Sequence, residues 1–194
     1  DCRMHVSIQK IRGYTLVELL VTLCVLAILL SLALPAFADV VRRVQSETVV
    51  NSLANAYQLA RSAAINQRQP VVFCAKAGAG SCGNDWTNGA LVFQDPNGNR
   101  VMENEEKLLA EIAQPPTGSQ LKMRAALNKQ YLRFMANGML ENTAGSITYC
   151  PPKGTPRDAR NLIFTRNGRL RFGNDQNRDG IPENAEGQPL SCPL

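Results

Sequence analysis

The chain has 194 residues and a formal net charge of +5, which suits one ordinary domain plus a membrane segment. This charge is too small to indicate a nucleic-acid binder by itself, so its distribution along the chain matters more than its total. The single histidine, His5, stands in the first few residues. Because the rest of the chain has neither histidine chemistry nor a G-x-x-x-x-G-K-[ST] phosphate loop, we expect no enzyme.

An almost entirely apolar run covers residues 16–38, and Glu18 interrupts it near its start. A secretory signal peptide would use Ala36–Ala38 as its A-x-A cleavage site, but its apolar core usually spans only about 7 to 15 residues. A plain membrane anchor has a suitable length, because a bilayer needs roughly 20 residues. It leaves Glu18 unexplained, since an ionised carboxylate at membrane depth costs several kcal/mol.

A third interpretation explains Glu18. The stretch "RGYTLVELL", residues 12–20, resembles the class III signal of type IV pilins and pseudopilins. In that pattern a short basic leader, here residues 1–13, ends in Gly13, and the carboxylate lies four positions after the new N-terminus. The resemblance implies cleavage after Gly13 by a prepilin peptidase and N-methylation of Tyr14.

Cleavage would create an α-amine about one helical turn from Glu18, on the same subunit or on a packed neighbour. Neutralisation of the two charges would make Glu18 an assembly residue through which the helix of residues 14–38 contacts other major and minor pilins. The same interpretation predicts a single-pass inner-membrane protein with a periplasmic head, residues 39–194. After assembly the protein would belong to an extracellular pilus.

The helix is expected to continue as an amphipathic stretch over residues 39–67. Apolar residues such as Val50, Leu53 and Tyr57 recur at three-to-four spacing, and "NQRQP" ends the pattern at Pro70. Short segments separated by Gly and Pro turn signals then predict strands throughout residues 68–194. They are Val71–Cys74, Ala90–Gln94, Lys107–Ala113, Gln120–Ala125, Tyr131–Met135, Ser146–Tyr149, Asn161–Thr165 and Arg169–Phe172. A long helix packed on an antiparallel β-sheet gives one α+β domain.

This order of elements resembles the GspH/FimT family of minor type IV pilins and pseudopilins, including its FimT- and FimU-like members. The matching stretches are "ANAYQLARSAAINQRQPVVFC" at 54–74, "DWTNGALVFQDPNGN" at 85–99, "LRFMANGML" at 132–140, "SITYC" at 146–150 and "LIFTRNGRLRF" at 162–172. The resemblance implies the type IV pilin fold and a minor pilin of the pilus or its tip complex. Two alternatives stay open: a structural pilin that couples the tip complex to the shaft without binding DNA, and a type II secretion pseudopilin.

Four of the six cysteines lie beyond the apolar run and predict two disulfides formed in an oxidising compartment. Cys74 and Cys82 flank a Gly-rich turn, which suits a short local bridge. A Cys150–Cys192 bridge would then tie the C-terminal tail to the sheet. A zinc site is the alternative, but the sequence has no CxxC pair and its histidine lies far upstream.

Positive charge is concentrated near the C-terminus. Residues 150–174 contain six basic residues against one acidic residue, a net charge of +5, whereas the remainder of residues 14–194 is net negative. Within this segment the dipeptide Asn167-Gly168 is typical of a hairpin turn. In the strand that follows, Arg169 and Arg171 would share one face. The simplest interpretation is a hairpin with a solvated basic face.

A second resemblance suggests a function for this hairpin. "GRLR", residues 168–171, is similar to the G-R-x-R motif near the C-terminus of DNA-capturing FimT-type pilins. It implies that Arg169 and Arg171, with Gly168 and Arg166 in the same turn, contact double-stranded DNA during uptake in natural transformation. Such arginines would hold phosphates with little base specificity, and binding would weaken steeply with salt.

The last motif, "DQNRDGIPENAE" at 175–186, fits the D-x-[DN]-x-[DN]-G-x5-E calcium-loop pattern. Its oxygen-bearing residues in register are Asp175, Asn177, Asp179, Glu183 and Glu186. A calcium ion could bind such a loop, but no cofactor is required. The favoured interpretation is an acidic solvent loop, because no helices flank the motif and Asp/Asn/Gly turns produce such matches easily.

Overall fold

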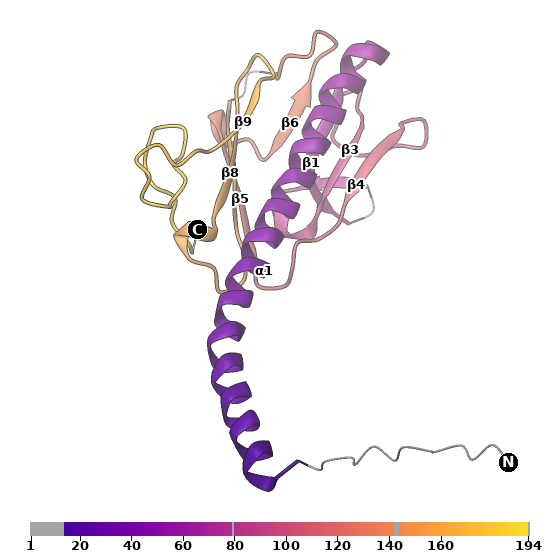
Figure 1. Ribbon diagram of the computed structural model, residues 1–194. Coiled ribbons are helices and arrows are strands. Elements are labelled where there is room, and N and C mark those ends of the chain that lie inside the picture. The colour runs from indigo at the N-terminus through magenta and orange to yellow at the C-terminus, as the bar shows by residue number, and fades with distance from the viewer. Residues whose placement is uncertain (1–13, 79, 142–143, 194) are drawn as a thin grey trace, which may run out of the picture. The chain divides into compact units, whose positions relative to one another are not determined.

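The computed structural model describes residues 14–78, 80–141 and 144–193, and it divides into two compact units, Asp1–Val40 and Val41–Leu194 (Figure 1). In the first unit the described residues belong almost entirely to α1 (Leu16–Gln67), which continues into the second unit. By length and composition α1 can cross a membrane, with a mean hydropathy of 2.7 over its most apolar window. The leader and Gly13 lie outside the described residues.

The second unit contains the C-terminal part of α1 and two antiparallel sheets. The first sheet has the order β2-β1-β3-β4, with β6 also paired to β1, and the second has the order β5-β7-β8-β9. The strands are β1 (Val71–Ala77), β2 (Ser81–Gly83), β3 (Ala90–Gln94), β4 (Leu108–Ile112), β5 (Gln120–Ala125), β6 (Tyr131–Phe134), β7 (Gly145–Cys150), β8 (Arg160–Phe164) and β9 (Leu170–Phe172). Short 3-10 helices cover Trp86–Asn88 (η1), Ala126–Asn128 (η2) and Pro156–Asp158 (η3).

An alanine-rich face of α1 packs against both sheets. Ala60 and Ala64 are completely buried, and such small side chains let a helix approach the strands closely. Tyr57 reaches both sheets: its ring meets Phe134 of the first sheet edge-to-face at 4.8 Å between centroids, and Phe164 of the second at 6.3 Å. One helix face therefore holds the two sheets in a common core.

The end of α1 at Gln67 confirms the boundary expected from the sequence. Arg68 follows with a positive φ of 54°, which turns the chain out of the helix. Pro70 comes two residues later and could not continue it. The chain then enters β1, whose residues Val71, Phe73 and Ala75 face the core.

The predicted α+β architecture of a long helix on antiparallel strands is confirmed, but the strands form two sheets rather than one. Pro115 and Pro116 follow β4, and β5 pairs with β7 instead of β4. The strand β2 was not predicted, because Ser81–Gly83 lies in a Gly-rich turn without alternating polarity. It pairs with the end of β1 through Lys76 and Cys82.

Both expected disulfides are present. Cys74–Cys82 joins β1 to β2 with a Cα–Cα distance of 5.5 Å, and Cys150–Cys192 joins the end of β7 to the C-terminal tail at 6.0 Å. Cys150 is buried with Ala159 and Leu190 in a small apolar cluster of its own. The tail is therefore packed as well as cross-linked, and these four thiols are not available to bind zinc.

A buried carboxylate connects η3 to α1. Asp158 accepts hydrogen bonds from the backbone N–H and the hydroxyl of Thr155, at 2.9 and 2.8 Å, and its Oδ2 lies 3.9 Å from Nε of Arg42. Burial alone would raise the pKa of Asp158. The two hydrogen bonds and the charges of Arg42 and Arg43 outweigh that effect, so the pKa lies below its ordinary value of 3.8.

Candidate functional site

The basic hairpin predicted from the sequence connects β8 to β9. The N–H of Gly168 donates to the carbonyl of Thr165 at 2.9 Å, and the N–H of Thr165 donates to the carbonyl of Arg169 at 3.0 Å. Gly168 has a φ of 74°, a left-handed conformation that suits glycine. The glycine of the "GRLR" motif therefore ends the turn, two residues before β9 begins at Leu170.

A second turn packs directly against this one. The N–H of Leu140 donates to the carbonyl of Arg166 at 2.8 Å, and a Cβ placed on Gly168 would lie 2.3 Å from the carbonyl oxygen of Gly138. Arg61 of α1 donates from Nε to that same carbonyl at 3.1 Å. Both its φ and the close approach of the second turn therefore require glycine at position 168. Arg61 links the two turns to α1. Sequence reasoning did not identify this role of Arg61.

The hairpin displays three exposed arginines, Arg166, Arg169 and Arg171. None of their side chains forms a hydrogen bond or an ion pair with any residue that the structure describes. Leu170, between the last two, packs against the core, so the predicted alternation is present. Arg160 of the same basic segment differs, because it pairs with Glu47 at 3.4 Å. The hairpin can therefore offer its full set of guanidinium donors to an anion.

The acidic loop of residues 175–186 is held by hydrogen bonds from its own N–H groups. Asp175 accepts from the N–H of Gly180 at 2.8 Å, and Asp179 accepts from the N–H of Ile181 at 2.7 Å. Glu183 is buried and accepts from the N–H of Gln176 at 2.8 Å.

The other two predicted ligands do not join them. Asn177 bonds to Asp179, and Glu186 is exposed. Across the described residues no group of three or more His, Cys, Asp or Glu side chains could hold a metal ion. The loop therefore agrees with the acidic solvent loop favoured from the sequence.

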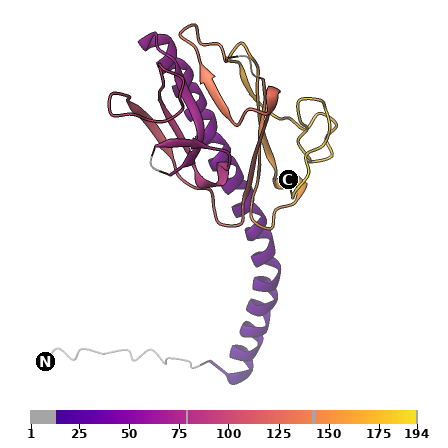
Figure 2. The ribbon, with the colours of Figure 1, turned by 180° about the vertical axis from the view of Figure 1, so that it is seen from behind.

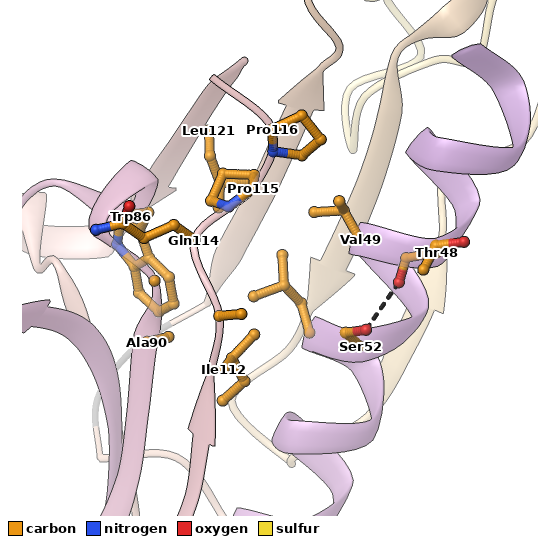
Figure 3. Close-up of a pocket in the computed structure, with 13 residues that line it drawn as sticks. Thr48, Val49, Ser52, Trp86, Ala90, Ile112, Gln114, Pro115, Pro116 and Leu121 are labelled. Carbon is orange, nitrogen blue, oxygen red and sulfur yellow. Dashed lines mark hydrogen bonds between the residues drawn. The ribbon is translucent and has the colours of Figure 1, made fainter. Parts of the chain in front are cut away.

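An apolar pocket lies between α1 and the segment that follows β4 (Figure 3). It has a volume of about 200 Å³, and its lining, which includes Val49, Trp86, Ile112 and Pro115, contains no charged side chain. The hydroxyl of Ser52 donates to the carbonyl of Thr48 within the helix at 2.9 Å. The pocket therefore offers neither an acid–base pair nor a cation for binding phosphate.

At the start of α1, Thr15 and Glu18 form a capping box. The N–H of Glu18 donates to the Thr15 hydroxyl at 3.2 Å, and the Glu18 carboxylate accepts from the N–H of Thr15 at 3.2 Å. Tyr14 precedes this box and is 90% exposed. The carboxylate of Glu18 is thus held at the helix N-terminus, beside the residue that cleavage would make terminal.

Known structures define the class of protein to which this arrangement belongs. The chain is similar to the type IV minor pilin FimU of Pseudomonas aeruginosa, with 20% identity and a TM-score of 0.55 over 77% of this chain and 96% of that chain. It is also similar to the minor pseudopilin EpsH from the Type 2 Secretion System of Vibrio cholerae, with 14% identity and a TM-score of 0.50 over 66% of this chain and 95% of that one. The fold is that of a type IV pilin.

Comparison with family models identifies the protein family within this fold. The model of the type II transport protein GspH matches residues 49–168, more than half of the sequence, and the chain belongs to the GspH family. The prokaryotic N-terminal methylation motif matches residues 8–34, which include Tyr14 and Glu18. No curated protein matches the chain significantly. The family and fold neighbours are pilins and pseudopilins rather than enzymes, as expected, and such a chain needs no cofactor.

Proposed function

We propose that this minor pilin binds double-stranded DNA through the β8–β9 hairpin and contributes to DNA uptake in natural transformation. The observation that carries the proposal is the set of exposed arginines, Arg166, Arg169 and Arg171, whose side chains have no partner among the described residues. The turn that presents them is held by Arg61 and by the neighbouring glycine turn. Phosphate contacts of this kind give affinity without base readout.

The test measures transformation and piliation together for Arg169→Ala/Arg171→Ala. We expect transformation to fall while pili stay intact, and the purified full-length variant in detergent to bind a labelled duplex more weakly. The matched control is Arg68→Ala/Lys107→Ala, which removes two exposed charges outside the hairpin. Equal binding by the wild type and the hairpin variant would refute DNA capture by these arginines. Loss of pili would instead support a structural coupling role.

We also propose that the chain enters the pilus after cleavage behind Gly13 and methylation of Tyr14, with the head in the periplasm beforehand. The N-terminal methylation motif and the apolar part of α1 support this route. The carboxylate of Glu18 would then neutralise the new amine of Tyr14 on a neighbouring subunit. An intact mass beginning at Tyr14 is expected, and an N-terminus at Asp39 would contradict it.

The capping box requires a specific control for Glu18. Glu18→Ala removes both the charge and the helix cap, whereas Glu18→Gln keeps a side chain that can cap and removes only the charge. We expect both variants to insert into the membrane and neither to be incorporated into pili. Normal incorporation of Glu18→Gln would show that the carboxylate acts as a helix cap rather than as a charge partner.

The second candidate function is that of a type II secretion pseudopilin, which would contact exported proteins. The description of the matching family model, type II transport protein GspH, favours it. A deletion strain separates the candidates: loss of exported enzymes with normal transformation indicates the secretion role. Loss of transformation with normal export indicates DNA uptake.

A further inference from the structure

The face of the second sheet that points away from α1 carries basic side chains at both edges. In β5, Met123 is buried in the core, so its neighbours Lys122 and Arg124 lie on the opposite, exposed face. At the other edge β9 exposes Arg171, with Arg169 just before the strand. The C-terminal segment, yellow in the ribbon, lies on this side of the sheet in both views (Figures 1 and 2).

Strand register aligns these two edges. Arg124 is opposite Ser146, Ser146 is opposite Ile163, and Ile163 is opposite Arg171, so one cross-strand row begins and ends with an arginine. Three strand spacings separate the two arginine backbones, a distance of about 14 Å. The major groove of duplex DNA is about 12 Å wide. Ile163, in the middle of the row, is buried, and the C-terminal segment lies on this side of the sheet. The two edges are therefore spaced to contact phosphates on either side of a groove, with that segment between them.

The four basic side chains at these edges are not used within the described part of the chain. Lys122, Arg124, Arg169 and Arg171 are all exposed, and none of their side chains forms a hydrogen bond or ion pair with a described residue. Arg160, in contrast, pairs with Glu47. The side-chain N–H groups of these four residues can therefore bind an external ligand that carries several anionic groups.

Beside β5 the surface is hollowed into a polar groove of about 440 Å³ between β5, β7 and residues 184–191. Lys122, Arg124 and the hydroxyl of Ser146 line it. One carboxylate, that of Glu186, lines it as well and has no side-chain partner among the described residues. The groove therefore combines two cations with a single anion.

We propose that Lys122 and Arg124 form a second phosphate-binding edge, which acts together with Arg169 and Arg171 to hold the two phosphate backbones of duplex DNA on either side of the C-terminal segment that covers the outer face of the second sheet. This inference rests on the proposed DNA-binding function and extends it to a region outside the hairpin. Because the contacts are to phosphates, the surface binds duplexes of any sequence. Glu186 weakens the binding by its charge.

The test uses the full-length chain in detergent and a fluorescently labelled duplex of mixed sequence, titrated over a series of salt concentrations. Loss of two phosphate contacts makes the slope of log K against log[salt] shallower by about 2. At about 0.15 M salt the same loss weakens binding about 30-fold. We expect both effects for Lys122→Ala/Arg124→Ala and for Arg169→Ala/Arg171→Ala. Arg68→Ala/Lys107→Ala should keep the wild-type slope, and Glu186→Gln should bind more tightly.

The outcomes separate this inference from the function on which it rests. A wild-type chain that does not bind DNA refutes the proposed function itself. Weak binding by the hairpin variant, with wild-type slope and affinity for Lys122→Ala/Arg124→Ala, refutes only the second edge. A β5 variant that binds DNA normally but fails to enter pili assigns that edge to subunit contact and also refutes it. If the alanine variant is unstable, Lys122→Gln/Arg124→Gln removes the charges with less change in side-chain volume.

Discussion

Replacement of Gly168 by alanine tests how the arginine hairpin is held. Gly168 has a φ of 74°, and the added Cβ would lie 2.3 Å from the carbonyl oxygen of Gly138. That oxygen belongs to backbone, so one of the two turns must move. Movement would break the hydrogen bond from Leu140 to Arg166 and the one from Arg61 to Gly138.

The size of the effect follows from these contacts. An alanine in the left-handed region costs about 1 kcal/mol or slightly more. Each lost hydrogen bond adds about 0.5 to 1.5 kcal/mol, so Gly168→Ala should lower the free energy of unfolding by about 2 to 4 kcal/mol in total. Gly187→Ala is the matched control, because Gly187 has a φ of 77° but nothing within 4 Å of an added Cβ.

Urea unfolding of the full-length variants in detergent, followed by tryptophan fluorescence, measures both free energies. We expect Gly168→Ala to lose about 1 to 3 kcal/mol more than Gly187→Ala. Equal losses would show that left-handed strain alone explains the glycine and that the contact between the two turns contributes nothing. The hairpin would then be held by its own strand pairing rather than by α1.

Two further predictions concern the stability of the head. Removing the bridge Cys150–Cys192, which spans 42 residues, should cost about 4 kcal/mol, whereas removing Cys74–Cys82, which spans 8, should cost about 2.5 kcal/mol. Urea unfolding of the two double-alanine variants checks this order, and the reverse order would contradict the loop-length reasoning. Because the pKa of Asp158 is lowered by folding, its stabilising contribution is present above about pH 4 and is lost as the pH falls through its folded-state pKa. Unfolding measured over a pH series should show this loss for the wild type, and Asp158→Asn should lack it; an identical acid dependence would contradict the assignment.

The elements of this fold were predictable where local sequence determines them. The end of α1 at Gln67 and the bounds of β3 (Ala90–Gln94) and β5 (Gln120–Ala125) agree with the sequence. Helix periodicity, Pro70 and the turn residues act within a few positions, which explains this accuracy. The pairing of β6 with β1 was not predictable, because it depends on contacts between segments far apart in the chain.

The arrangement of the acidic loop, residues 175–186, could not be predicted from its sequence. Asp175, Asp179 and Glu183 have the residue types and spacing of a calcium site, but the described residues do not bring them together as a metal-binding group. The position of each carboxylate depends on the path of the loop backbone, which hydrogen bonds from the loop N–H groups help to fix. In the structure those of Gln176, Gly180 and Ile181 point at the carboxylates. Sequence spacing contains no information about that geometry.

The basic surface follows sheet register rather than proximity in sequence. Charge density along the chain pointed to residues 150–174, yet Arg160 in that segment is engaged by Glu47. Arg124 lies outside the segment and shares a cross-strand row with Arg171. If the two edges act together, a variant that lacks only the hairpin arginines should retain part of its salt dependence, and the rest should disappear when Lys122 and Arg124 are also replaced. DNA capture would then be a property of one sheet face, and the "GRLR" motif would mark only one of its edges.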